Sequence, residues 1–348
     1  MYYSHQDLIT FCTQILEAAG VETDDACTTA EALVSADLRG VFSHGCIRIE
    51  GYVRCIQTGG IKAKATYSVE TEGDAYALVN AGQGLGIPVS VFAMELAKEK
   101  AKKAGIAVVN VRNSHHHGAC GYYALMCARD GMIGLAMSTG DPIMAAPGSA
   151  DAVIGNNPFS YAVPAGKYRA ICYDVAMSVV AAGKISIAAD RGEKIPEGWL
   201  LSPEGIPTTD PADINRGGVL LPFGGYKGYG FSIMVESLAG ILSGAALLKD
   251  IHAWNHNPNA SGDVGHCFVA INPKLINFAL DISAQAERMI EQLAEAKKAP
   301  GASRIYFPGQ IENEKEEEAL KIGIALPEPS KNALERAAKM VGISTSIN

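Results

Sequence analysis

The sequence predicts an α/β protein in which helices cover the faces of a mixed β-sheet, with a helical region ahead of the sheet. Short runs rich in β-branched residues, such as 76–81 (YALVNA) and 106–111 (IAVVNV), recur along the chain, and a helical pattern over Val89 to Lys103 separates these two. Apolar residues at helical spacing predict two earlier helices, between Ser4 and Gly20 and from Thr23 to about Leu38. This alternation is typical of a sheet flanked by helices.

Composition narrows the class of protein. The chain has 348 residues, of which 48% are hydrophobic and 19% charged, so it can bury a large core. A net charge of -8 with no basic stripe argues against nucleic-acid binding. The eight cysteines are scattered without a C-x-x-C pair, and neither a signal peptide nor a membrane span is expected. We therefore expect a cytoplasmic protein that does not enter a membrane.

A glycine run at Gly82, Gly84 and Gly86 is similar to part of a dinucleotide-binding loop. Its surroundings do not fit that loop, because Pro88 follows closely and the next strand ends in Arg112 rather than in an acidic residue. We expect instead that these glycines let a strand turn tightly into the helix that starts near Pro88. The fold is therefore not predicted to be a Rossmann fold.

Two polar clusters carry groups suited to hydroxy-acid chemistry. One is Ser43-His44-Gly45 with Arg48, and the other is the run 113–118, with histidines at 115, 116 and 117. Histidine can hold or release a proton near neutral pH, and arginine can bind a carboxylate through two parallel hydrogen bonds. The alternative for Arg48 is a surface ion pair with Glu50. Lys184 and Lys227 lie beside glycines, where a phosphate or ribose could approach, although simple solvent exposure also explains them.

The order and spacing of these clusters resemble the malate/L-lactate dehydrogenase family, which also contains sulfolactate, ureidoglycolate and diketogulonate enzymes. The resemblance runs from about Ser43 to Gln310 and includes the segments SHGCIR, NSHHHGACGYY, IGNNPFSYAVP, DVAMSVVAAGKI, LLPFGGYKGYG and YFPGQ. It implies a three-layer α/β/α body around a mixed seven-stranded sheet, distinct from the Rossmann fold. It also implies a homodimer that binds NAD or NADP near the subunit interface.

The resemblance also implies roles for individual residues. His116, His44 and Ser43 are the expected catalytic residues, and Arg48 and Tyr52 are expected to bind the substrate. The residues expected to contact the cofactor are Gly140, Asp174, Val175, Ala176, Lys184, Lys227, Pro308, Gly309 and Gln310. No metal is expected. The chain is divided into an N-terminal helical region (1–75) contributing to the substrate site, a cofactor-binding body (76–310) and a helical tail packing on the body (311–348).

Some positions depart from the family pattern. This chain has Ser138-Thr139, Met177 and Gln310 where family members commonly have Thr-Asn, threonine and glutamate. The stretch from Ser138 to Pro142 and the P-G-Q turn are more similar to ureidoglycolate dehydrogenase than to the malate enzymes. The sequence therefore leaves open which acid is used and whether the cofactor is NAD or NADP.

The predicted function is an NAD(P)-dependent oxidoreductase that interconverts a small 2-hydroxy acid and its 2-keto acid. In this hypothesis Arg48 fixes the carboxylate, and His116 takes the hydroxyl proton while Ser43 and His44 orient the oxygen. Two alternatives stay open: a non-catalytic binding protein of the same fold and a zinc-dependent hydrolase. The hydrolase would draw its ligands from His115, His117, His252, His256 and His266, but no metal-binding spacing is present.

Overall fold

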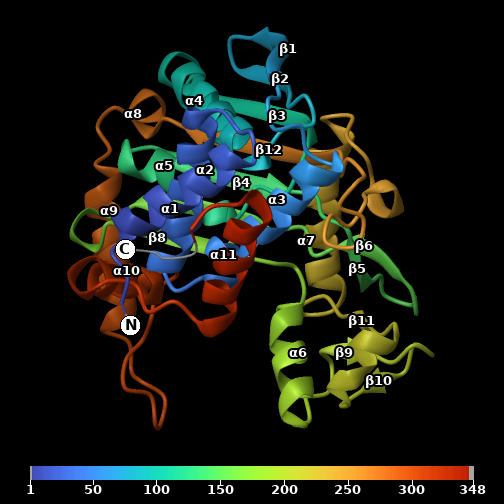
Figure 1. Cartoon of the computed structure of the whole chain (residues 1–348). Coiled ribbons are helices and arrows are strands. Elements are labelled where there is room, and N and C mark those ends of the chain that lie inside the picture. Colours follow the sequence, from blue (N-terminus) through green and yellow to red (C-terminus); the bar gives the residue numbers. More distant parts are fainter. Residues whose placement is uncertain (1, 345–348) are drawn as a thin grey trace.

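A seven-stranded mixed sheet lies at the centre of the protein (Figure 1). The structure is a computed structural model and describes residues 2–344. Strands β2 and β3 run parallel, and every other neighbouring pair in this sheet is antiparallel. In spatial order the strands are β1 (Ser68–Gly73), β2 (Tyr76–Asn80), β3 (Ile106–Ser114), β12 (Val264–Ile271), β4 (Ile133–Ser138), β7 (Phe159–Pro164) and β8 (Ala170–Val175). The mixed seven-stranded sheet that the resemblance implies is confirmed.

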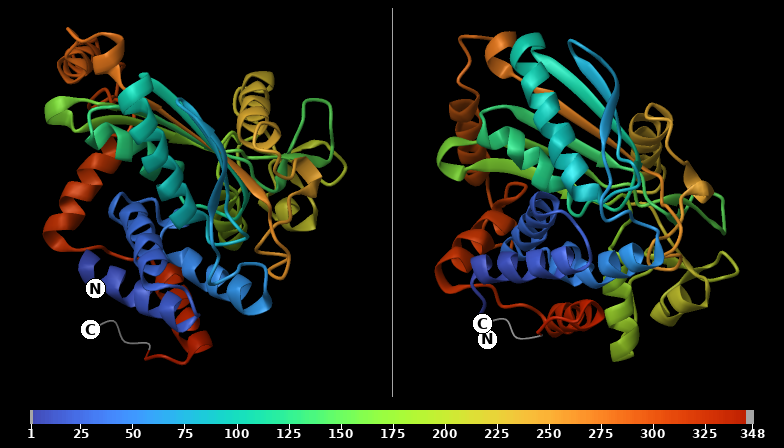
Figure 2. Two further views of the ribbon diagram at one scale, coloured as in Figure 1. Left: turned by 90° about the horizontal axis from the view of Figure 1, so that it is seen from above. Right: turned by 45° about the horizontal axis from the view of Figure 1, so that its top comes forward.

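Helices pack on both faces of this sheet (Figure 2). One face carries α4 (Gly86–Ala104) and α5 (Cys120–Arg129), and the other carries α7 (Tyr226–Val235), the π-helix η5 (Glu236–Ile241) and α9 (Ile282–Ala294). Alternate residues of a strand point to opposite faces. In β3, Val109 therefore packs in the cluster with α4 and α5, whereas Val108 packs in the cluster with α7. This is the expected three-layer arrangement.

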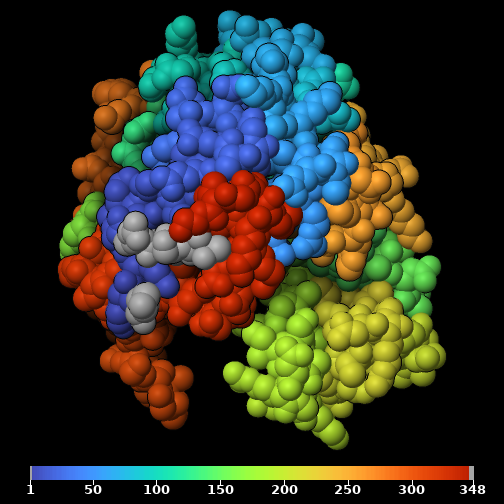
Figure 3. All heavy atoms as spheres, viewed as in Figure 1, coloured from blue at the N-terminus to red at the C-terminus, as the bar shows by residue number. Residues whose placement is uncertain are grey.

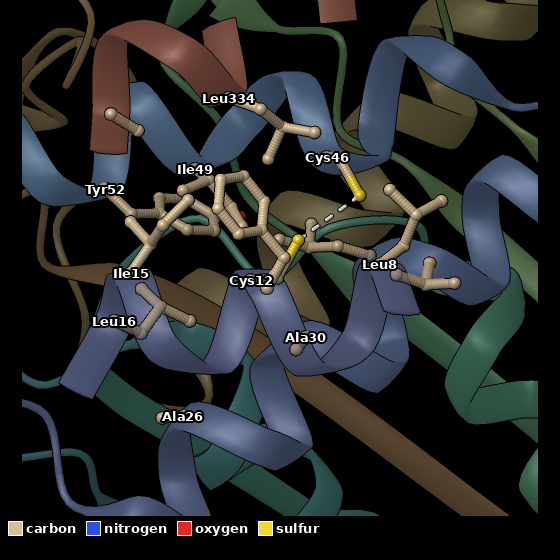
Figure 4. Packing of buried hydrophobic residues seen from close by; sticks show 14 of the residues in the cluster. Leu8, Cys12, Ile15, Leu16, Ala26, Ala30, Cys46, Ile49, Tyr52 and Leu334 are labelled. Atoms are coloured by element: carbon tan, nitrogen blue, oxygen red, sulfur yellow. Dashed lines mark hydrogen bonds between the residues drawn. The ribbon is translucent and has the colours of Figure 1, made fainter. Parts of the chain in front are cut away.

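The N-terminal helices form a second core beside α4. They are α1 (His5–Ala18), α2 (Thr23–Leu38) and α3 (Ile49–Thr58), with the short 3-10 helices η1 (Phe42–His44) and η2 (Cys46–Arg48) before α3. The side chain of Ser4 accepts a hydrogen bond from the backbone N–H of Gln6 and so caps α1. The C-terminal helix α11 (Glu328–Val341) adds Leu334 to this core (Figure 4). The two predicted N-terminal helices are confirmed.

Residues from about 180 to 220 form a lobe that projects from the body (Figure 3). It contains α6 (Ala182–Arg191) and η4 (Pro211–Arg216), and its strands join β5 and β6 in a second sheet. In spatial order that sheet is β10 (Pro207–Thr208), β9 (Leu200–Leu201), β11 (Val219–Leu220), β5 (Pro142–Ala145) and β6 (Ala152–Gly155). The remaining elements are η3 (Gly166–Tyr168), η6 (Leu248–Asp250), α8 (Pro273–Ile276) and α10 (Gln310–Ile322).

The helix that begins at Tyr226 changes character partway along. It is α-helical to Val235 and then continues as the π-helix η5. Buried Glu236 begins this π-turn, where its carboxylate accepts hydrogen bonds from the Asn157 side chain at 2.7 Å and the Leu248 backbone at 2.9 Å. Such π-turns are frequent at functional sites. Within residues 2–344, no helix has both the length and the apolar character that crossing a membrane requires.

Candidate active site

The loop that carries the three histidines links the end of β3 to the start of α5, and the first residue of α4 lies directly against it. A Cβ at Gly86 would overlap the carbonyl oxygen of His115 and lie 2.7 Å from that of His116. Residue 86 must therefore be glycine for α4 to begin this close to the loop. Gly86, the third glycine of the run that resembles a dinucleotide-binding motif, serves this backbone approach.

The three histidine rings point in different directions. His117 stacks on His266 with the ring centroids 4.2 Å apart, and His266 is also hydrogen-bonded to the hydroxyls of Ser138 and Ser114 at 2.9 Å each. The ring of His115 lies edge-on to Trp254, with 5.8 Å between the centroids. Residues 2–344 contain no group of three metal-ligating side chains placed to share an ion, so nothing in the geometry supports the zinc hydrolase alternative.

His116 faces the N-terminal helices, where the Tyr52 hydroxyl lies 2.7 Å from its Nδ1. The backbone N–H of Gly118 also approaches Nδ1, at 3.4 Å. A backbone N–H can only donate, and no other acceptor for the Tyr52 hydroxyl is present within residues 2–344, so both groups donate to Nδ1. The neutral imidazole of His116 therefore carries its hydrogen on Nε2.

The second cluster is brought to His116 by η1, η2 and α3. The rings of His44 and His116 stack with centroids 5.7 Å apart and an interplanar angle of 27°. Ser43 is exposed, and its hydroxyl lies 2.9 Å from Nδ1 of His44. Tyr52 was predicted to contact the substrate, but its ring is fully buried in the N-terminal core (Figure 4) and its hydroxyl contacts His116. The geometry places Tyr52 behind the imidazole.

Asp37 fixes the turn that carries Ser43 and His44. It is buried at the end of α2, and one carboxylate oxygen accepts the backbone N–H of Cys46 at 2.8 Å. A Cβ at Gly45 would overlap the other carboxylate oxygen, so glycine is required there as well. Burial raises the pKa of Asp37 from its ordinary 3.8 to about 7. Sequence reasoning missed this residue, because nothing in the motif signals the contact.

The guanidinium of Arg48 is held in place by one of its nitrogens, while the other two have no hydrogen-bond partner within residues 2–344. Its Nε donates to the carbonyl oxygen of Ser43 at 2.6 Å, and its carbon lies 5.7 Å from the centre of the Trp254 ring. No acceptor for its two terminal nitrogens occurs within residues 2–344, so both are available to a carboxylate. The predicted alternative, an ion pair with Glu50, is not formed, because Glu50 pairs with Arg54 and Arg336.

Burial and the nearby charge of Arg48 keep His44 and His116 uncharged at neutral pH. Burial, with a contribution from the nearby Arg48 charge, lowers the pKa of His44 from its ordinary 6.5 to about 4. Burial also lowers the pKa of His116 well below 6.5, and the charges of Arg48 and His44 act in the same direction. Burial raises the pKa of Asp141, which neighbours Arg48, although the Arg48 charge opposes that rise. Asp141 directly follows Gly140, which was predicted to contact the cofactor.

Asp174, Val175 and Ala176 lie at the end of β8, close to the start of α5. The Asp174 side chain is exposed, and desolvation by the neighbouring protein atoms raises the pKa of its carboxyl to about 6. It accepts the backbone N–H of Gly121 at 2.9 Å. The 308–310 turn lies against the same strand, where Pro308 accepts the Cys172 N–H at 3.0 Å and Gly309 has φ +88°. These residues are joined to the histidine loop through α5.

The two lysines predicted to bind the cofactor lie in different places. Lys227 is exposed in the first turn of α7, next to Gly225, at which an added Cβ would meet no atom within 4 Å. Lys184 is exposed on α6, where it lines a surface cavity of about 250 Å³ in the projecting lobe. An exposed cation at Lys227 and an accessible carboxylate at Asp174 suit the phosphates and ribose hydroxyls of a nicotinamide dinucleotide. The side chains present therefore fit such a cofactor.

Comparison with known proteins gives the same class. The family model of malate/L-lactate dehydrogenase matches residues 3–335. A malate dehydrogenase from Pyrococcus abyssi is 38% identical, covering 97% of this chain and 94% of the relative. The NAD(+) ureidoglycolate dehydrogenase of Escherichia coli strain K12 is 32% identical over 94% of this chain and 93% of the relative. The sulfolactate dehydrogenase structure from Methanocaldococcus jannaschii superposes with a TM-score of 0.92 at 32% identity, covering 99% and 98% of the two chains.

Fold, site and relatives together define an oxidoreductase of the 2-hydroxy-acid dehydrogenase class. The chain belongs to the malate/L-lactate dehydrogenase family. It is therefore an enzyme that acts on a CH–OH group with a nicotinamide cofactor.

The Asp37→Asn variant tests the anchoring of the Ser43–His44 turn. A group whose pKa is higher in the folded protein than in the unfolded chain stabilises the fold below its unfolded pKa, and that stability is lost as the pH rises through the folded value, here about 7. We expect the wild-type Tm to fall more between pH 5 and pH 8 than the Tm of Asp37→Asn, measured by calorimetry. The exposed Asp74→Asn serves as the control and should keep the wild-type profile. Equal pH profiles for Asp37→Asn and wild type would contradict this account.

The lowered histidine pKa values predict an unusual pH dependence of the reaction. A histidine that acts as the base in hydroxy-acid oxidation, as predicted from the sequence, must be neutral, and the free protein keeps His44 and His116 neutral well below pH 6.5. We expect kcat/KM for oxidation to stay level from pH 8 down to about pH 5.5 and to decline below it. An acid limb centred at pH 6.5 or higher would show that burial does not lower the pKa of the base.

Proposed function

We propose that this enzyme interconverts a small 2-hydroxy acid and its 2-keto acid, of the malate or lactate type, using NAD or NADP. The observation that carries the proposal is the convergence of Arg48 and His116 on one indole ring. The Arg48 guanidinium carbon and the His116 ring centroid lie 5.7 and 5.2 Å from the centroid of Trp254. A carboxylate and the oxygen on the neighbouring carbon can therefore be held by these two side chains at once.

In the mechanism we propose, the chain's own groups bind the acid and move one proton. The terminal nitrogens of Arg48 bind the carboxylate, and Nε2 of His116 faces the oxygen on C2, with His44 and Ser43 beside it. A bound carboxylate offsets the positive charge of Arg48, which is one cause of the lowered His116 pKa. Binding of the acid therefore favours a second proton on Nδ1, from which Tyr52 can accept a hydrogen bond.

The proton then moves at Nε2 of His116. In reduction the imidazolium gives its Nε2 proton to the keto oxygen and keeps its hydrogen on Nδ1. Oxidation is the reverse and starts from that tautomer, so the hydrogen that the free protein holds on Nε2 must first move to Nδ1, where Tyr52 accepts it, before Nε2 takes the hydroxyl proton. The nicotinamide, when bound, donates or accepts the hydride. Asp174, Val175, Ala176, Lys227 and the 308–310 turn are the residues that we propose to hold the cofactor, with Gly140 and Lys184 as further contacts.

Ureidoglycolate oxidation is a second candidate within the same chemistry. The relatives that share this fold are named for malate, ureidoglycolate and sulfolactate, and the Ser138–Pro142 stretch is more similar to the ureidoglycolate enzymes. A matrix of malate, lactate, sulfolactate and ureidoglycolate against NAD and NADP, followed by absorbance of the reduced nicotinamide, distinguishes these substrates. Turnover of none of these acids or their keto counterparts with either cofactor would contradict the proposed function.

Arg48→Lys tests the carboxylate contact. Lysine keeps the positive charge but loses the two parallel hydrogen bonds, and a hydrogen bond to a charged group is worth about 1.5–3 kcal/mol. We expect kcat/KM to fall by roughly 10- to 100-fold, mainly through KM. Arg54→Lys is a matched control, because Arg54 lies on the same helix but is exposed and paired with Glu50. An Arg48→Lys variant with wild-type KM would exclude this role.

We further propose that the enzyme is a homodimer with its site near the interface between the subunits. Exposed apolar side chains follow α7 and η5, among them Phe231, Ile241 and Leu242. Such a row of apolar side chains is typical of a protein contact. It begins on the same helix as Lys227, so a second copy packed there would border the proposed cofactor residues. The N-terminal, body and tail divisions and the cytoplasmic location stay predictions.

Ile241→Asp tests the dimer. An aspartate in the centre of an apolar contact would be desolvated without a partner, so we expect the variant to elute as a monomer in size exclusion with light scattering and to lose cofactor affinity. Phe278→Asp is the control, since Phe278 is 93% exposed near α8, away from α7 (Figure 1). A monomeric wild-type protein, or a dimeric Ile241→Asp variant, would contradict this interface.

A further inference from the structure

Trp254 lies in a segment that docks along one face of α3. The face consists of Gly51, Tyr52 and Cys55, and Arg48 lies directly before the helix on the same side, three and four residues ahead of Gly51 and Tyr52. The Cys55 thiol donates to the carbonyl oxygen of Trp254 at 3.6 Å. Farther along, the Thr58 hydroxyl donates to the carbonyl oxygen of Pro258 at 2.7 Å. This docking places the indole beside the proposed substrate groups.

The orientation of the indole follows from its contact with Gly51. A Cβ at residue 51 would overlap Cζ3 of Trp254 and would lie 3.0 Å from Cη2 and 3.3 Å from Cε3. These atoms form the outer edge of the six-membered ring, so that edge is seated on α3. The five-membered ring, which carries Nε1, lies at the opposite end of the indole. The N–H of Trp254 is therefore directed away from the helix.

The indole N–H has no acceptor in the protein but remains open to water. Nε1 of Trp254 is not among the buried atoms that lack a hydrogen-bond partner, and no residue within 2–344 accepts a bond from it. The centroid of the same ring lies 5.7 Å from the Arg48 guanidinium carbon and 5.2 Å from the His116 ring centroid. An unused, accessible donor thus lies next to the groups proposed to hold C1 and the C2 oxygen of the acid.

We propose that Trp254 is a specificity-determining residue whose indole N–H donates a hydrogen bond to an acceptor on the side chain of the substrate. This inference rests on the proposed function. The substrate class it specifies is the 2-hydroxy or 2-keto acid that carries a second acid or carbonyl group beyond C2, in preference to acids with a purely apolar side chain. Tryptophan suits this role because its indole is a donor only and is held rigidly by Gly51 and Tyr52.

Trp254→Phe tests the inference, because phenylalanine keeps an aromatic ring on α3 and removes the N–H. Reduction of oxaloacetate, which has a distal carboxylate, is compared with reduction of 2-oxobutyrate, which has none. We expect kcat/KM for oxaloacetate to fall by roughly 10- to 100-fold, mainly through KM, and the value for 2-oxobutyrate to stay within about threefold. Trp199→Phe removes the other tryptophan of the chain, in the projecting lobe, and should leave the ratio of the two acids unchanged.

A binding measurement separates this inference from the proposed function. In the Trp199→Phe protein, Trp254 is the sole indole, and its fluorescence is followed without cofactor while L-malate or L-lactate is added. We expect L-malate to produce the larger change at lower concentration. A fluorescence preference for malate without turnover of any acid would support this inference and overturn the proposed function. Turnover with an equal loss for both keto acids in Trp254→Phe, or with no loss for either, would overturn this inference alone.

Discussion

The close contact between the first residue of α4 and the histidine loop is the constraint on which the site depends. Because Gly86 has no side chain, α4 can begin against the carbonyl oxygens of His115 and His116. The side chains of His115, His116 and His117 then point from this loop into three different environments. His117 enters the buried core beside His266, and His116 is left facing Tyr52 and the N-terminal helices.

The N-terminal region completes the site because its helices pack beside α4 while its 3-10 turns reach the histidine loop. Asp37 fixes the turn that carries Ser43 and His44, and Arg48, at the end of η2, is hydrogen-bonded to that turn. Tyr52 contacts His116 from inside the N-terminal core. The same burial that gives Tyr52 its fixed position also lowers the pKa of His44 and His116. The free protein therefore presents the Arg48 guanidinium next to neutral imidazoles, and in the proposed mechanism a bound carboxylate favours protonation of His116.

Much of the fold could be predicted from local pattern. Helical spacing and caps located α1 and α2, and β-branched runs located β2 and β3, because each signal lies within a few neighbouring residues. Two imidazole rings from loops 72 residues apart, at 44 and 116, lie together as the resemblance implied. Trp254 and Asp37 were missed because their contacts depend on tertiary docking: one is seated on Gly51, and the other holds a backbone N–H nine residues away. The π-turn at Glu236 was missed for the same reason, since its partners Asn157 and Leu248 are not helix neighbours.

The central claim is that the loop holds His116 as a neutral imidazole with its hydrogen on Nε2. Nitrogen-15 NMR of histidine-labelled protein at pH 7, with the His116 signals assigned by comparison with His116→Gln, measures this directly. The account predicts a ring with a protonated Nε2 and a non-protonated, hydrogen-bonded Nδ1 in the free protein. A free protein in which His116 is an imidazolium, or in which Nδ1 carries the only ring hydrogen, would contradict it.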